Sequence, residues 1–536
     1  MNPNTLLIDH EKKNSKSIAE HYLKIICQNS PVVYKTISEF GHFPLGEYLK
    51  GFDNDLSSNL QNSDNLVDIV YRYAERFLGS SLALKASKDF CTNPVVLTAN
   101  HHGVDYFAQS VQGSLLFALS KINGNGVKST VPIFSCGSVP LDNLTYPMGL
   151  LLYHVNCDRS HALPRKLPVF SNSLRRAMVS VSSSFTDEMV NRAKNRLDKM
   201  VDEKKIPSRL AICLHKIFDE DYSCSDVMSL SSYSHQSVVL NHRIWKRLFK
   251  DPGIVPQMVY LELEEITRRL LISDLFNQDS LAWCVLFDSD LREKVIEELD
   301  GKMACWRMEN LLKRIEMGKI DSEKKEILNN CGTVFFWGIN SKGRKIPFCI
   351  DTNVLGKTFL RGVDDRGKLY QIPFSFESIT VALNEKRIVP SIFTCFLEVA
   401  FARSVVCVGG YYQAEYLPKI QKGLVRALRQ AKGYHESASM VEKVITDTYL
   451  SGMQTVMIRV KANELIPAGP LEIIAAGGLT KEDLNKILSL TLKDAHLASL
   501  FETLPDLAPK AIETNQWQKD LAAECFELLD GKIVVK

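Results

Sequence analysis

A short polar segment, NHHGVD at positions 100–105, contains the side chains of this chain best suited to chemistry. Two imidazoles and a carboxylate so close together could act as acid and base, contact a phosphate or bind a metal ion. We predict that His101, His102 and Asp105 are catalytic, with Asp105 orienting an imidazole. The alternative is a polar turn whose side chains only cap the helix that follows it.

The elements around this segment suggest where it lies. An apolar run at 95–97 precedes it, helical spacing follows at 111–119, and a second apolar run occupies 131–134. Strand, polar turn, helix and strand form the βαβ unit of a parallel sheet. Such a sheet binds ligands at the carboxyl ends of its strands, so we expect Asn100 and Gly103 to contact substrate. Glycine would also let the backbone approach a ligand closely.

A second junction of this kind occurs later in the chain. The apolar run at 404–408 ends in Gly409-Gly410, and a helical pattern starts at once. Backbone amides at a helix N-terminus point outward and can contact a ligand. We predict Gly409, Gly410, Gln413 and Tyr416 as substrate-binding residues, and Glu415 as a catalytic residue that orients an amine or hydroxyl. Aromatic packing at an ordinary helix start is the alternative.

Two further clusters are weaker candidates. Apolar runs flank the turn at 340–344, which predicts a β-hairpin, and Arg344 there could hold a carboxylate or phosphate. The other cluster is His154, Cys157, Asp158 and His161, whose spacing matches no common zinc site. We therefore predict no metal ligands in that cluster.

The composition excludes several classes of protein. The chain has 536 residues, 65 basic and 62 acidic, so its net charge of +3 argues against nucleic acid as a partner. Its 13 cysteines are scattered without CxxC spacing, which favours reduced thiols and a cytoplasmic location. No secretory segment and no membrane-spanning apolar run is present in the sequence, so we expect no membrane partner. The sequence leaves homo-oligomer formation open.

Three motifs together resemble the bacillithiol synthase family, the cysteine-adding enzymes of bacillithiol formation. They are TANHHGVD with a helix ending at Lys121 and the strand VPIF, the pair VFFWGINSKGRKIPF, and SVVCVGGYYQAEYLPKI. Their order agrees over residues 94–425. The resemblance implies a Rossmann-like core interrupted by helices, and an addition or condensation on a small polar molecule. The chain departs from the family where His101-His102-Gly103 replaces a glutamine pair.

We accordingly expect an α/β fold, with an interrupted Rossmann-like parallel sheet, helical insertions and an α+β C-terminal region. The expected parts are a helical N-terminal cap (1–90), the first part of the core (91–265), a helical insertion (266–330), the second part of the core (331–430) and the C-terminal region (431–536).

Three functions fit the sequence. The first is a synthase or transferase acting on a small polar, amino-acid-like or nucleotide-like substrate, for which a nucleotide is a candidate cofactor. The second is a metal-dependent hydrolase or oxygenase that uses His101, His102 and Asp105. The third is a non-catalytic scaffold or regulatory protein. The first and the third differ in whether His101, His102 and Glu415 converge in space, because catalysis requires groups within reach of one substrate.

Overall fold

A five-stranded parallel sheet lies at the centre of the computed structural model, which describes residues 17–52, 64–122, 129–155, 164–317, 331–512 and 516–536. Its strands are β1 (Val95–Leu97), β2 (Thr130–Ser135), β5 (Gln257–Glu262), β12 (Val406–Gly410) and β13 (Tyr449–Ser451). Their spatial order is β13-β12-β1-β2-β5, and all neighbours run parallel. The predicted α/β class and parallel sheet are confirmed. The next strands along the chain, β2 and β5, lie on one side of β1, and the later strands β12 and β13 lie on its other side. The strand order therefore reverses between β1 and β12.

Successive residues of β1 face two different hydrophobic clusters. Val95 and Leu97 belong to one cluster, together with helix α7 (Ala108–Ile122), and Val96 belongs to the other, together with helices α5 (Asp64–Leu78) and α6 (Ser80–Thr92). A strand that is buried on both faces needs apolar residues at consecutive positions. This requirement explains why the runs at 95–97 and 131–134 do not alternate with polar residues.

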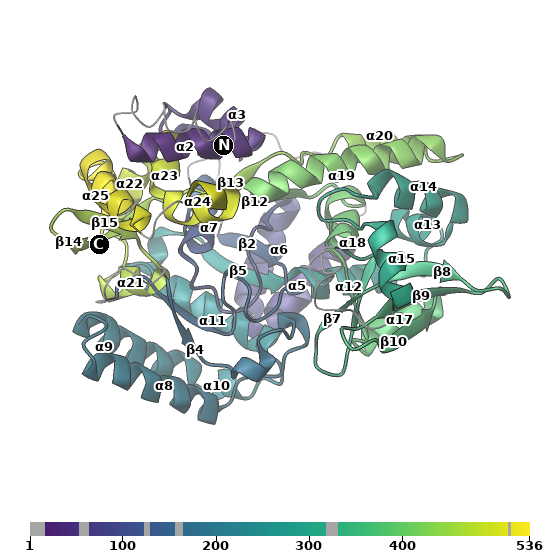
Figure 1. Cartoon of the computed structure of the whole chain (residues 1–536), viewed down its shortest axis with the longest axis horizontal. Helices are drawn as coiled ribbons and strands as arrows, with labels where there is room; N and C mark the ends of the chain where they lie inside the picture. The colour runs from purple at the N-terminus through teal and green to yellow at the C-terminus, as the bar shows by residue number, and fades with distance from the viewer. Residues whose placement is uncertain (1–16, 53–63, 123–128, 156–163, 318–330, 513–515) are drawn as a thin grey trace, which may run out of the picture.

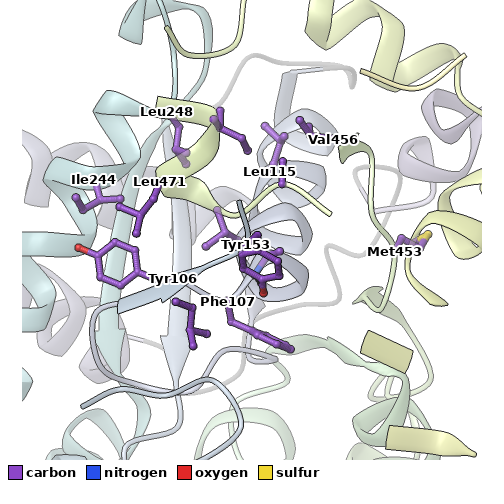
Figure 2. Packing of buried hydrophobic residues seen from close by; sticks show 14 of the residues in the cluster. Tyr106, Phe107, Leu115, Tyr153, Ile244, Leu248, Met453, Val456 and Leu471 are labelled. Carbon is purple, nitrogen blue, oxygen red and sulfur yellow. Dashed lines mark hydrogen bonds between the residues drawn. The ribbon is translucent and has the colours of Figure 1, made fainter. Parts of the chain in front are cut away.

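The first hydrophobic cluster joins parts of the chain that are far apart in sequence. Tyr106, Leu115 and Tyr153 pack near Ile244 of helix α11 (Tyr233–Arg247) and near Leu248, which directly follows that helix (Figure 2). Val456 and Leu471 of the C-terminal region lie in the same cluster. The C-terminal region therefore packs directly against the first strand–helix unit.

Helices also lie between β2 and β5. After the antiparallel pair β3 (Gly149–Leu152) and β4 (Arg165–Pro168) come α8 (Asp187–Asp202), α9 (Ser208–Ile217), the π-helical turn η3 (Phe218–Tyr222), α10 (Ser225–Met228) and α11. Thr186 caps α8, because its side chain accepts a hydrogen bond from the Met189 amide.

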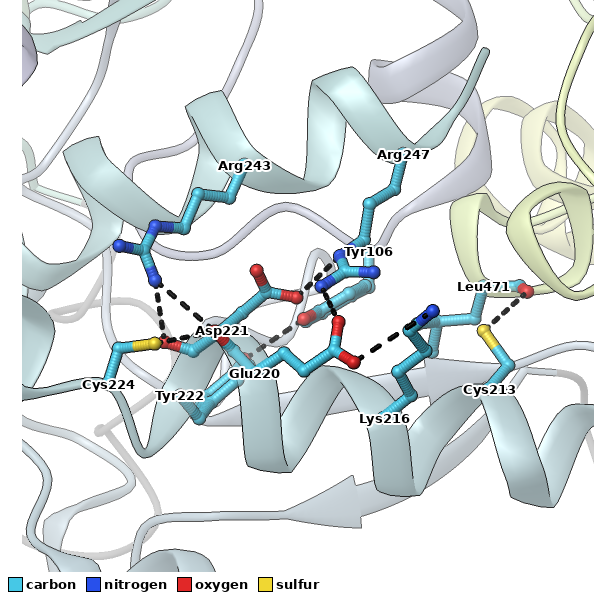
Figure 3. Close-up of polar contacts among 10 residues, drawn as sticks. All are labelled: Tyr106, Cys213, Lys216, Glu220, Asp221, Tyr222, Cys224, Arg243, Arg247 and Leu471. Carbon is cyan, nitrogen blue, oxygen red and sulfur yellow. Dashed lines mark hydrogen bonds and ion pairs between the residues drawn. The ribbon is translucent and has the colours of Figure 1, made fainter. Parts of the chain in front are cut away.

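Ion pairs fix the π-helical turn to α11 (Figure 3). Arg247 Nε lies 2.7 Å from Asp221 Oδ2, and its Nη2 lies 2.8 Å from Glu220 Oε2. Arg243 pairs with Asp226 in α10. Arginine can serve several acceptors at once because its donors form a rigid planar fork, so two side chains of α11 hold the whole turn in place.

The segment after β5 begins with four helices: α12 (Leu263–Asp274), α13 (Leu281–Phe287), α14 (Ser289–Leu299) and α15 (Met308–Met317). Two three-stranded antiparallel sheets follow. One contains β6 (Phe336–Ile339), β7 (Lys345–Pro347) and β11 (Ile388–Pro390), and the other contains β8 (Cys349–Thr352), β9 (Thr358–Val363) and β10 (Leu369–Pro373). Between β10 and β12 lie α17 (Phe376–Asn384), capped by Ser375, then α18 (Ile392–Phe396) and the π-helical turn η6 (Leu397–Phe401).

The predicted hairpin at 340–344 is confirmed by β6 and β7, which pair antiparallel. Within the predicted second part of the core, however, only β12 joins the central sheet. Short turns join antiparallel neighbours, whereas parallel neighbours need long crossovers, so the strands at 336–373 form sheets of their own.

After β12 come α19 (Tyr411–Gln430) and α20 (His435–Glu442), which extend to one side in Figure 1. The C-terminal region has a three-stranded sheet of β14 (Val456–Lys461), β15 (Glu464–Pro467) and β16 (Val534–Val535). Its helices are α21 (Pro470–Ala475), α22 (Lys481–Ser489), α23 (Leu492–Ala498), α24 (Leu500–Leu507) and α25 (Trp517–Leu529). This region is therefore a mixture of helices and strands, in line with the sequence pattern.

The N-terminal helices fall into two groups. α2 (Ile18–Asn29), α3 (Pro31–Phe40) and the short α4 (Leu45–Lys50) lie beside the C-terminal helices, with α2 contacting α24 and α25 (Figure 1). In contrast, α5 and α6 contact strands of the central sheet. Among the described helices, none combines the length and the hydropathy needed to span a bilayer.

Candidate functional site

A cavity of about 660 Å³ opens at the carboxyl ends of the central strands. Its lining includes residues just beyond β1 (Thr98, His101), beyond β2 (Cys136), at the end of β12 (Gly410) and at the end of β13 (Ser451). The opposite wall comes from the segment after β5 and includes Lys302, Arg307, Trp337 and Lys345. The cavity therefore lies where the strand order reverses, the position at which open parallel sheets bind ligands.

His101 lines this cavity, as its position after β1 predicts. The pairing of β1 with β2 continues beyond both strands, because His101 forms a parallel bridge with Cys136. The His101 carbonyl also accepts a 2.7 Å hydrogen bond from the Tyr260 hydroxyl. Nδ1 of His101 lies 3.4 Å from Thr145 Oγ1. Burial lowers the pKa of His101 to about 4, a hydrogen bond with Asn143 opposes that effect, and the charge of Lys345 adds to it. The imidazole is therefore neutral at pH 7 and able to accept a proton.

The other polar residues of the 100–105 segment point away from the cavity. His102 is completely buried, with Nδ1 2.7 Å from Ser135 Oγ and Nε2 3.0 Å from Ser234 Oγ. A buried polar group with such partners serves the packing of the fold. Gly103 has φ +128, and a Cβ atom there would lie 2.6 Å from Pro147 Cβ, so its glycine is needed for the backbone.

Asp105 is likewise occupied within the fold. It accepts hydrogen bonds from Asn100 Nδ2 (3.0 Å), Ser110 Oγ (2.6 Å) and the Phe107 amide (3.1 Å). Burial raises the pKa of Asp105 to about 6, while these hydrogen bonds lower it. Asp105 therefore orients the start of α7, and its hydrogen-bond partners among the described residues do not include either histidine. Asn100 and Asp105 match the alternative interpretation, a polar turn that caps the helix.

Of the residues predicted at the second junction, Gly410, Gln413 and Tyr416 line the cavity, and Tyr411 and Tyr412 line it with them. Gln413 Nε2 donates to Thr98 Oγ1 (2.8 Å) and to the Cys407 carbonyl (3.0 Å), so this amide fastens β1 to β12. A Cβ atom at Gly409 would lie 2.4 Å from Gln413 Cβ, which explains the glycine.

Glu415 and Arg344 are not among the residues that line the cavity. Glu415 pairs instead with Lys419, at 2.9 Å. Arg344 lies in the β6–β7 turn, and the residue that follows it, Lys345, lines the cavity. Successive strand residues point to opposite faces, so a one-residue difference in register decides which cation reaches the cavity.

The metal alternative finds no support in the arrangement of side chains. Within the described ranges, no group of three or more His, Cys, Asp and Glu side chains is placed to hold a metal ion, so His101, His102 and Asp105 do not form one. Cys157, Asp158 and His161 of the second histidine cluster lie outside the described residues.

Sequence reasoning missed a group of side chains beside His101. Cys136 follows β2 directly, and its thiol donates to Glu264 Oε1 at 3.2 Å. Glu264 is only 2% exposed and also accepts the amides of Gly137 (2.6 Å) and Ser138 (2.7 Å). The ammonium of Lys345 lies over the Trp337 ring, 4.5 Å from its centroid. Cys136 and Glu264 both stand just after a strand of the central sheet, so applying the strand-end rule to β2 and β5 would have found them.

Electrostatics keep the thiol of Cys136 protonated in the resting protein. Burial and the neighbouring Glu264 raise its pKa, and the charge of Lys345 opposes them. Burial lowers the pKa of the Lys345 ammonium, an effect that Cys136 and Glu264 oppose. Burial and Glu262 raise the pKa of Glu264, whereas the amides of Gly137 and Ser138 lower it.

The two helices that start at the cavity differ in how their N-termini are satisfied. At α7, the Ala108 amide donates to the Tyr153 hydroxyl (2.9 Å), which in turn donates to Glu502 Oε1 (2.5 Å). Glu502 Oε2 accepts from Gln454 Nε2 (2.6 Å). At α19, Gly410 forms the cap without any side-chain hydrogen bond. Of these two helix starts, it is therefore the one of α19 that lacks a side-chain cap, and an anion would find donors there.

Glu502 also makes the stability of the protein depend on pH. Burial raises the pKa of Glu502 to about 8, against the hydrogen bonds from Tyr153 and Gln454. A raised carboxyl pKa contributes stability that is present below the unfolded pKa of about 4.5 and is lost as pH rises through 8. Glu502→Gln removes this loss, so the melting temperature of the variant minus that of wild type should rise between pH 5 and pH 9. Melting curves of both proteins across that range test this, and a constant difference would contradict it.

Comparison of the chain with known protein families, with curated proteins and with solved structures finds no match, so its function has to be argued from the chemistry of this cavity.

Proposed function

We propose that this protein is an enzyme, a synthase or transferase that adds a group to a small polar molecule carrying an anionic group. The observation that supports this most is the 660 Å³ cavity at the reversal of the strand order, which His101 lines together with three cations. Pockets of a few hundred Å³ or more with a few placed polar groups are typical of small-molecule sites.

The residues of the cavity divide the work between binding and proton transfer. Lys302, Arg307 and Lys345 offer positive charge on one wall, and the amides at the start of α19 offer hydrogen-bond donors on the other. His101, neutral at pH 7, would take a proton from the attacking group as the new bond forms. Thr145 and Asn143 would orient the imidazole, the role that the sequence had suggested for Asp105.

The strand order supports a more specific fold. With the central strands numbered along the chain, the order is 3-2-1-4-5, as in doubly wound Rossmann-like sheets. We therefore propose a Rossmann-like core, in which a nucleotide is one candidate for the anionic ligand and bacillithiol synthase one candidate relative. No disulfide joins the cysteines of the described ranges, which supports a reducing compartment such as the cytoplasm.

Ligand binding to two matched variants tests the proposal. Lys345→Met removes a cation from the cavity, and Arg344→Met removes the adjacent cation, which does not line it. We expect calorimetry with pyrophosphate, citrate and ATP to show at least one ligand that Lys345→Met binds about 10- to 100-fold more weakly, because a hydrogen bond to a charged group contributes about 1.5–3 kcal/mol. Arg344→Met should bind that ligand as wild type does.

Two results would count against the proposal. Equal weakening by both substitutions would mean that the ligand binds to general surface charge. A protein that binds none of the three anions would favour the scaffold alternative, in which the fold persists without a substrate.

A further inference from the structure

We propose that Cys136 is the covalent nucleophile of this cavity, with Glu264 as its base, and that it carries an acyl group between two substrates. This inference deepens the proposed transferase function and rests on it. The geometry that carries it is the S–H···O contact of 3.2 Å between Cys136 and a carboxylate that is almost completely buried. A nucleophile within hydrogen-bond reach of a base that other groups hold in place is the arrangement found in covalent catalysis.

Glu264 is built into a fixed position. The amides of Gly137 and Ser138 donate to its two oxygens, at 2.6 and 2.7 Å, so the carboxylate cannot turn away from the thiol. These two residues follow Cys136 in the chain, whereas Glu264 stands in the first turn of α12. The turn after β2 and the helix after β5 therefore hold acid and thiol together.

An independent feature of the cavity indicates that a ligand belongs there. Gln109 lines the cavity and is 7% exposed, yet its buried Nε2 atom has no hydrogen-bond partner among the described atoms. A buried donor without a partner destabilises the fold, because it has lost its hydrogen bonds to water without replacing them. An oxygen of a bound molecule, such as an acyl carbonyl, is the kind of acceptor that this amide lacks.

The transfer takes place in two balanced steps. In the first, the sulfur of Cys136 attacks the carbonyl carbon of an activated acyl donor, an ester or mixed anhydride. The C–S bond forms, the bond to the leaving group breaks, and the thiol proton passes through Glu264 to the leaving group. In the second, an amine attacks the thioester, the C–N bond forms and the C–S bond breaks. The amine proton passes through His101 and restores the thiol of Cys136.

The ester p-nitrophenyl acetate provides the test, since acylation releases p-nitrophenolate and leaves an acetyl group on the protein. We expect wild type to show a burst of p-nitrophenolate and, in peptide mass spectrometry, an acetylated Cys136. Cys136→Ala should lose the burst. Glu264→Gln should slow it by about 10²-fold or more, the range over which a positioned base acts.

Cys305 provides the matched control, because it lines the same cavity and no carboxylate of the described residues acts on its thiol as Glu264 acts on Cys136. Cys305→Ala should keep the burst, and melting curves of all variants establish that they are folded. Acetylation of another residue, or an unchanged rate in Glu264→Gln, would overturn the inference. If anions bind the cavity normally while the burst does not map to Cys136, this inference fails and the proposed binding function stands. If the burst maps to Cys136 but no anion binds, the thiol assignment stands and the proposed substrate preference fails.

Discussion

Trp306→Ala is expected to lower the free energy of unfolding by about 3–5 kcal/mol, the cost of removing a large buried aromatic side chain. Trp306 is completely buried and packs edge-on against Phe335 and Phe393, at centroid distances of 5.7 and 5.5 Å. Its Nε1 also donates to the Ile296 carbonyl at 3.0 Å, and the substitution leaves that carbonyl without its partner. Equilibrium urea unfolding of the variant and wild type measures the loss.

Because Trp306 lines the cavity, its loss should also weaken ligand binding. Trp306→Phe is the control, since it retains an aromatic ring and loses only the indole hydrogen bond and some volume. We expect it to cost clearly less than the alanine variant. A loss below about 1 kcal/mol in Trp306→Ala would show that this wall of the cavity adjusts to the missing volume.

Arg403→Met is expected to cost about 3–5 kcal/mol, because it leaves buried carboxyl groups without their cation. Arg403 Nη1 lies 2.7 Å from Glu398 Oε2, and Nη2 lies 2.8 Å from Asp274 Oδ1. The Glu398 side chain is 0% exposed, so water cannot replace the arginine. These residues join η6 and α12 just before β12, at the end of that strand opposite the cavity, so the start of β12 should loosen as well.

The cost of Arg403→Met should depend on pH. Burial and Asp274 raise the pKa of Glu398 well above its ordinary value, and Arg403 opposes this. Without the arginine the pKa rises further. A raised carboxyl pKa contributes stability that is lost as pH rises, so the deficit relative to wild type should grow as pH rises past the wild-type pKa of Glu398. The double variant Glu398→Gln/Arg403→Met has no charged Glu398, and its deficit should not vary with pH in this way. An equal pH dependence in both variants would contradict the role of Glu398.

The sequence predicted the place of the site better than its residues. The sequence predicts a polar segment at the carboxyl edge of the parallel sheet, where the cavity lies, because continuous apolar runs and glycine-containing turns are local signals. Which of two adjacent side chains turns into the cavity is not local. His101 and His102 are adjacent residues of the same type. The pairing with Cys136 nevertheless places the His101 side chain at the cavity and leaves the His102 side chain buried.

The cavity wall formed by the segment after β5 was beyond sequence reasoning for a related reason. Lys345 reaches the cavity only because the hairpin of β6 and β7 packs near the end of β2, and no pattern within 336–347 encodes that contact. Likewise, Glu264 looks like an ordinary charge at a helix start. Its role depends on Cys136, which lies more than a hundred positions earlier in the chain.

The position of β1 has a consequence for the synthesis of the chain. Val95 of β1 pairs with Val406, which lies 311 residues later in the chain, the difference between those two positions. One edge of β1 therefore has no partner until that later residue has been synthesised. At about 5–20 residues per second, a ribosome needs roughly 15–60 s to supply it. During that time the nascent chain presents an apolar strand with unsatisfied backbone groups, the kind of surface that other chains can pair with. Chaperones that shield such an edge during translation would then influence how much active protein a cell obtains.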